Sequence, residues 1–428
     1  MIFSLVIIWH ILRMVQPHLW GVTPFLEDIP ITSVTLLVAF VLLIIFKKNL
    51  IINYQVIFLV LLLPVIVVSG LLNGWLGGGV TDMTEFVVKS LLPFFLYINL
   101  LDTQKRLETF MMLNLLAALV MLSNGYSQIN SDLDIGLGWA GSILSQGTRI
   151  TYIGELNDPN DLGGFFVLCL PFAMYHLLYS NYFRKLFGIV CVGLLLSGVY
   201  LTNSRGTLVA VFVITGIYIY QRYGRSKFIF LSLLSSPIVV FVLSKFRAIE
   251  IESSAMGRLD AWASGFEFLK EGPLFGIGMG NFTDNAGITA HNSFVLIMGE
   301  LGLIGYSLWF SFVSLTFFMS FKLYLWFKNY IDEKEITFET NSALVKAYRI
   351  NIIALYSMVG YFTTSLFLSR TYTFITYLVC AFVIATTNNL SKFTEKESKI
   401  YGDKEVQKMF VYSFCSIIAM NIVLKVLI

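Results

Sequence analysis

Three side chains in the middle of the chain could together act on a phosphate-bearing substrate: Arg205, Arg258 and His291. A histidine whose pKa is near its ordinary value of about 6.5 can accept a proton from a hydroxyl group at neutral pH, as a general base does. Arginine stays charged at physiological pH, and its planar guanidinium suits two-point contact with phosphate. These residue types therefore predict proton transfer beside an anionic group, provided that the fold brings them together.

Two of these residues belong to a polar stretch, 257–305, that lies between long apolar runs. Polar backbone and charge are costly in lipid, so this stretch must lie in water or line a protein cavity, and we expect the chemistry there. Its GIGMG segment, 276–280, favours turns over a phosphate-binding loop, because no P-loop lysine follows. The spacing of Gly299, Gly302 and Gly305 predicts close helix–helix packing.

Several further polar residues can be interpreted in two ways, as helix caps or as substrate contacts. Asp158 and Asp161 stand in an Asn-Asp-Pro-Asn-Asp run that is typical of a helix cap, although an acid here could also orient a sugar or pair with Arg149. Asn292 could likewise cap a helix or contact substrate. In the connection 203–206, Asn203 and Ser204 suit a helix cap and Gly206 supplies backbone freedom, but neither feature explains Arg205.

No metal or cofactor is expected. The run 132–134 formally matches the Asp-Xaa-Asp pattern with which nucleotide-sugar transferases hold a metal, but that pattern needs a soluble nucleotide-binding domain. A solvated acidic loop is the better interpretation. The four cysteines lie in apolar runs without metal-ligand spacing, which indicates packing.

The composition is that of an integral membrane protein. Of the 428 residues, 57% are hydrophobic and only 13% are charged, against about 25% charged in a soluble domain. No polar stretch is long enough for a separate core, so residues 1–428 are predicted to form one membrane domain. The net charge of +3 suggests no nucleic-acid partner.

The apolar runs predict an all-α polytopic bundle of roughly 12 or 13 transmembrane helices, the first N-terminal run included. The other predicted spans lie near residues 31–46, 51–69, 84–101, 107–124, 158–180, 186–203, 206–221, 228–245, 291–321, 347–368, 371–390 and 409–427.

Lysine and arginine recur at every second connection, and such connections face the cytoplasm. The alternate connections are then external, chiefly 125–157 and a larger loop, 246–290. Basic residues on the external side run against this bias and call for a reason, such as an anionic ligand, a nearby acid or a lipid headgroup. They are Arg149, Arg205, Lys245, Arg247, Arg258, Lys270 and Arg370.

An ordered set of motifs between about residues 157 and 305 resembles the O-antigen ligase and polymerase family. The set comprises the Asp-Pro-Asn-Asp run, Asn-Ser-Arg-Gly at 203–206, Arg-Leu-Asp-Ala-Trp at 258–262, Pro-Leu-Phe-Gly-Ile-Gly at 273–278, His-Asn-Ser-Phe at 291–294 and Glu-Leu-Gly-Leu-Ile-Gly at 300–305. The flanking spans agree with the family only in hydropathy.

The resemblance implies a membrane-embedded glycosyltransferase of the GT-C type in the bacterial inner membrane, with its active site facing the periplasm or exterior. The donor would be a glycan on undecaprenyl diphosphate, and neither nucleotide sugar nor metal would be needed. The family's histidine maps onto His291 as base, and its arginines map onto Arg205 and Arg258 as diphosphate contacts. Arg149 has no motif match.

The acceptor stays open. Lipid A core, a growing polysaccharide and a protein hydroxyl all fit the family, and the absence of a large soluble extension favours lipopolysaccharide or exopolysaccharide assembly. The rival class is a transporter or flippase of an anionic lipid-linked substrate. Such proteins place charges deep within their spans and often contain internal repeats, whereas charge inside these predicted spans is sparse.

Overall fold

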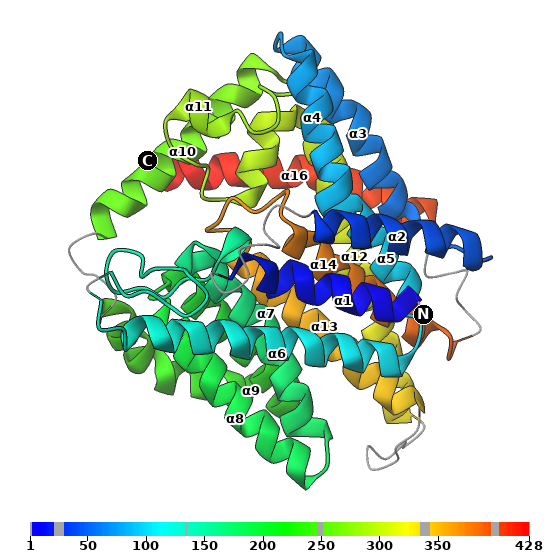
Figure 1. Cartoon of the computed structure of the whole chain (residues 1–428), viewed down its shortest axis with the longest axis vertical. Helices are drawn as coiled ribbons and strands as arrows, with labels where there is room; N and C mark the ends of the chain where they lie inside the picture. The colour runs from blue at the N-terminus through cyan, green and yellow to red at the C-terminus, as the bar shows by residue number, and fades with distance from the viewer. Residues whose placement is uncertain are drawn as a thin grey trace.

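The computed structural model describes residues 2–20, 30–133, 135–245, 251–333, 343–394 and 402–427. Every regular element in this part of the chain is a helix, and two isolated β-bridges occur in the loop before residue 150. The predicted all-α architecture is confirmed. The helices gather around a central group formed by α7 (Pro159–Tyr179), α13 (Ala343–Ser365) and α14 (Phe374–Ser391) (Figure 1).

The other helices, in chain order, are α1 (Ile2–Met14), η1 (Pro17–Leu19), α2 (Ile31–Phe46), α3 (Tyr54–Leu72), α4 (Leu76–Phe86), η3 (Val87–Leu91), α5 (Leu92–Leu100), α6 (Gln104–Ile129), η4 (Gly154–Leu156), α8 (Tyr182–Leu201), α9 (Arg205–Lys245), α10 (Ile251–Glu271), α11 (Phe282–Ala286), α12 (Ser293–Glu333) and α16 (Asp403–Leu427). The η3 segment is a π-helical turn that joins α4 to α5.

Among the described residues, 8 helices are long and apolar enough to cross a membrane, so the protein is a multi-pass membrane protein. The helices α1 and α2 are apolar but shorter. The two predicted spans 206–221 and 228–245 lie in the single element α9, which Gly224 interrupts with a positive φ of 79°. The predicted total of about 12 or 13 spans stays a prediction.

The core is packed with aromatic side chains from helices distant in sequence. Phe110 of α6 stacks on Phe382 of α14 with ring centroids 4.8 Å apart, and Phe172 of α7 meets the same ring edge-on at 5.3 Å. Buried aromatic pairs of this kind add stabilisation beyond the burial of their area. They tie α6, α7 and α14 together beneath the site described below.

Two predicted helix caps are confirmed. The Asp158 side chain accepts a hydrogen bond from the Asn160 backbone N–H at 2.7 Å, and a proline occupies the first position of α7. The Asn292 side chain accepts hydrogen bonds from the N–H groups of Phe294, at 2.9 Å, and Val295, at 3.2 Å. Each cap satisfies amide groups that would otherwise lack a partner at a helix start.

The predicted external loop 246–290 contains two helices, α10 and α11, joined by the GIGMG segment. Gly276, Gly278 and Gly280 all have positive φ values, which confirms the predicted turn. The turn is held against α12 by its backbone: the Ile277 and Gly278 N–H groups donate to the carbonyl oxygens of residues 299 and 300, at 3.1 and 3.0 Å.

The prediction that Gly302 serves helix–helix packing is wrong. Gly302 has a φ of 61° and a ψ of −161° and so interrupts α12. A Cβ atom at this position would lie 2.6 Å from the backbone carbon of Leu274. The glycine therefore admits the backbone of the 272–281 turn, and the close approach joins a helix to a loop.

Candidate active site

A cavity of about 320 Å³ lies where the first turns of α7 and α9, one residue of α10 and the segment just before α12 meet the end of α13. Arg149, Arg205, Arg258 and His291 all contribute to its lining, so four residues singled out from the sequence converge. The remaining lining residues come from the loops and helix ends around the cavity: Gln146, Asn160, Asn203, Ser204, Gly206, Thr207, Thr364, Phe367 and Leu368. None of these described lining residues is acidic.

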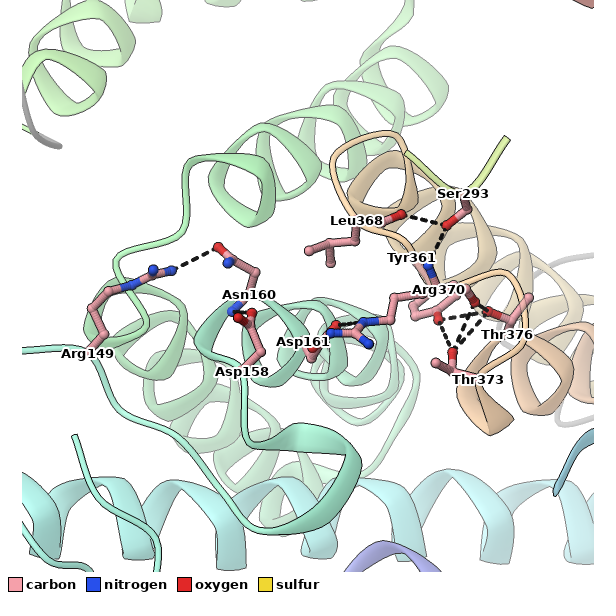
Figure 2. A network of polar contacts seen from close by, with 10 residues as sticks. All are labelled: Arg149, Asp158, Asn160, Asp161, Ser293, Tyr361, Leu368, Arg370, Thr373 and Thr376. Carbon is pink, nitrogen blue, oxygen red and sulfur yellow. Dashed lines mark hydrogen bonds and ion pairs between the residues drawn. The ribbon is translucent and has the colours of Figure 1, made fainter. Parts of the chain in front are cut away.

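Arg149 is fixed in place by two neighbouring elements. Its Nε donates to the Thr202 carbonyl oxygen at 2.9 Å. Its Nη2 donates to Asn160 Oδ1 at 2.8 Å, and Figure 2 shows this second bond. These bonds join the loop before α7 to the turn between α8 and α9. Arg149 is therefore held in the cavity wall by these two contacts. None of the family motifs found in the sequence includes this residue.

Arg205 is the first residue of α9 and follows a turn with unusual backbone geometry. Asn203, which has a φ of 48°, makes the left-handed step. The prediction that Gly206 supplies this freedom is wrong. A Cβ at position 206 would lie 3.1 Å from the Phe367 ring, so the glycine instead leaves room for that ring beside Arg205.

Arg258 reaches the cavity from α10. Its guanidinium carbon lies 5.9 Å from the centre of the Phe367 ring, a cation–π geometry that limits where the group can point. Burial and the nearby charge of Arg205 lower the pKa of Arg258. Two cations that line one cavity whose described lining residues include no acid form a setting that favours a bound anion.

His291 stands immediately before the cap of α12 and has a φ of 48°, in the left-handed region. Burial and the Arg258 guanidinium lower the pKa of His291, and the carboxylate of Asp158 opposes them only in part. The imidazole is therefore neutral at neutral pH and able to accept a proton. A histidine in this state beside two arginines is the combination that a base next to an anionic group requires.

Asp161 lies outside the cavity lining and pairs with a different arginine. Two of the three guanidinium nitrogens of Arg370, Nε and Nη2, donate to its carboxylate oxygens, a bidentate ion pair seen in Figure 2. The Arg370 backbone is itself anchored: its N–H donates to the Ser293 hydroxyl at 2.9 Å, and its carbonyl accepts from Thr376 at 2.6 Å. This pair joins the start of α7 to the turn after α13.

The remaining basic residues that were predicted to be external are Lys245, Arg247 and Lys270. Lys270 forms an ion pair of 2.8 Å with Glu267 in which both side chains are well exposed. Arg247 and the side chain of Lys245 lie outside the described residues, as does Asp134 of the Asp-Xaa-Asp run. Within the described residues, no cluster of three histidine, cysteine or acidic side chains could hold a metal ion.

Sequence reasoning missed the contribution of the turn after α13. Thr364, Phe367 and Leu368 line the cavity, and Phe367 contacts both Gly206 and Arg258. The one available signal was Arg370, an arginine in a short connection predicted to be external. Because these residues are more than a hundred positions from Arg258, no local pattern could place them in the site.

The helices and the cavity define the class: a multi-pass membrane protein with a basic, histidine-containing cavity at one end of its bundle. Residues 189–310 match the model of a family described as O-antigen ligase, and this match supports assigning the chain to the O-antigen ligase and polymerase family. Arg205, Arg258 and His291 all fall within the matched residues. No curated protein matches the chain.

Proposed function

We propose that the protein transfers a glycan from undecaprenyl diphosphate to an acceptor hydroxyl at the outer face of the bacterial inner membrane. One observation carries the proposal: a single cavity is lined by His291 together with Arg205 and Arg258, and none of its described lining residues is acidic. The family match supports glycan transfer in the membrane, and the charges of the cavity suit a diphosphate leaving group.

In the proposed reaction, the acceptor hydroxyl loses its proton to His291 as its oxygen bonds to the anomeric carbon of the donor sugar. The bond from that carbon to the diphosphate oxygen breaks, and the electron pair leaves with the diphosphate. Arg205 and Arg258 stabilise the charge that develops there, as preorganised groups do at a leaving group. Direct displacement inverts the anomeric configuration. The proposed reaction uses no metal ion, and the enzyme is proposed to be of the GT-C type.

The roles of the remaining residues follow from their contacts. Arg149 is proposed to contact the donor, because its two hydrogen bonds hold its side chain at the cavity. Asp158 and Asn292 are proposed to act as caps that place α7 and α12, and Asp161 as the partner of Arg370. The proposed acceptor is lipid A core or a growing polysaccharide, with a protein hydroxyl as the alternative.

The test uses the purified protein in detergent micelles with a defined undecaprenyl-diphosphate glycan and alternative acceptors. We expect a transferred glycan as product without any transmembrane gradient. If no acceptor is glycosylated and the donor moves across vesicles that contain the protein, the protein is a transporter or flippase and the proposal fails. Which acceptor is glycosylated then distinguishes a ligase, a polymerase and a protein glycosyltransferase.

A further inference from the structure

A second cavity, of about 470 Å³, lies at the opposite ends of the helices that form the first. It involves the last residues of α7, the middle of α9, the second half of α12 and the first turns of α13. None of its described lining residues belongs to the candidate active site. Three basic side chains and five tyrosines contribute to its wall: Arg222, Lys328, Arg349, Tyr179, Tyr218, Tyr324, Tyr348 and Tyr356.

None of the described residues that line this cavity is acidic. The Arg349 guanidinium carbon lies 4.9 Å from the centre of the Tyr179 ring, and the Tyr356 hydroxyl donates to Gln221 Oε1 at 2.5 Å. Glu108, on the adjoining α6, is occupied by Lys346 and Tyr175. The cavity thus combines fixed positive charge with hydroxyl groups, which suits a phosphate group.

An apolar cavity of about 580 Å³ adjoins the basic one. The two cavities share five lining residues, namely Gln221, Tyr324, Lys328, Ile352 and Tyr356. Beyond them the wall is mostly hydrocarbon and aromatic and includes one further basic residue, Arg225; its apolar residues are Ile217, Phe317, Phe321, Leu325, Leu355 and Val359. A ligand that fills both cavities therefore needs an anionic head and an apolar chain.

We propose that these joined cavities bind a phosphate-bearing lipid, with its headgroup at Arg222, Lys328 and Arg349 and an acyl chain along Phe317 and Leu325. Basic pockets between membrane helices are suited to anionic headgroups, and burial of the chain adds hydrophobic free energy. A free phosphate would use only the basic cavity. This lipid is distinct from the proposed glycan donor, whose diphosphate would lie at the other end of the bundle.

The test measures lipid binding by native mass spectrometry of the full chain in a neutral detergent. Dioleoyl phosphatidylglycerol is compared with dioleoyl phosphatidylcholine and with glycerol 3-phosphate, which shares the phosphate but has no chain. We expect one phosphatidylglycerol to be retained preferentially by the wild-type protein. In the double variant Arg222→Gln/Lys328→Gln, whose two side chains are exposed, its affinity should fall by about tenfold or more.

The control is the double variant Lys105→Gln/Lys185→Gln, which removes the same charge from exposed side chains outside both cavities. This control should bind phosphatidylglycerol as the wild type does. Equal loss in both variants would overturn the proposal, because it would reduce the effect to net charge. Equal affinity for phosphatidylcholine, or for glycerol 3-phosphate, would also overturn it. Neither variant touches the candidate active site, so this outcome is independent of the glycan-transfer test.

Discussion

Asn160 and Asp161, neighbours in the first turn of α7, bind two different arginines. The Asn160 side chain accepts a hydrogen bond from Arg149, at 2.8 Å, at the edge of the cavity, whereas the Asp161 carboxylate accepts hydrogen bonds from Nε and Nη2 of Arg370 outside the cavity lining (Figure 2). One turn of helix thus positions an arginine of the site and also anchors the turn that carries Phe367.

Asp161→Asn should lower stability. The Asp161 side chain is 5% exposed and that of Arg370 is 32% exposed, so the substitution leaves a largely desolvated guanidinium without its anion. We expect a loss of about 1–3 kcal/mol in the free energy of unfolding, less than for a fully buried pair. Thermal unfolding in detergent measures it. The matched control is Glu267→Gln, which breaks an exposed pair and should change stability little. Equal unfolding temperatures for the two variants would contradict the assignment.

Gly276→Ala should disrupt the attachment of the 272–281 turn to α12. Gly276 has a φ of 70°, and a Cβ there would lie 2.3 Å from the backbone carbon of Glu300. The control Gly280→Ala has a similar φ of 80° but meets no atom within 4 Å. Backbone strain alone costs about 1–3 kcal/mol, and the clash adds to it at position 276. The unfolding midpoint of Gly276→Ala should therefore fall below that of Gly280→Ala, and the reverse order would be evidence against this packing.

The sequence was sufficient to predict the helical class, the caps formed by Asp158 and Asn292, and that Arg205, Arg258 and His291 lie together; their roles stay predictions. Each rests on a local signal: the length of an apolar run, the chemistry of a helix cap, or a basic residue in a connection predicted to be external, where basic residues are rare. The backbone break at Gly302 and the pairing of Asp161 with Arg370, 209 residues away, depend on contacts between distant segments. No spacing rule along one chain could have indicated them.

The rate of transfer should depend on pH through His291. Because burial and Arg258 lower the pKa of His291, the base is neutral above a pKa that lies below about 6.5. Transfer should therefore fall as pH decreases through that value and stay level just above it. In Arg258→Gln, which removes one nearby positive charge, the acid limb of the residual activity should move to higher pH. If the acid limb does not move, the group whose titration sets it is not influenced by Arg258.

The two arginines proposed to contact the diphosphate, Arg205 and Arg258, should act as more than simple point charges. If Arg205 and Arg258 make bidentate contacts with diphosphate, replacement by lysine should restore only part of the activity that alanine removes. Initial rates of transfer by Arg205→Lys, Arg205→Ala and the corresponding Arg258 variants test this. Lys270→Ala, on the exposed face of α10, serves as the charge control and should transfer normally. Full activity in both alanine variants would rule out the diphosphate role.

His291 is proposed to be the base of a glycan transferase, and the rate of transfer by the purified His291→Asn variant tests this role. Asparagine tolerates the left-handed backbone at this position but cannot act as the base, so a normally folded variant should lose at least about 100-fold in rate. His18→Ala, a histidine that does not line the cavity, should keep its activity. Transfer by His291→Asn at the wild-type rate would show that His291 is not the base.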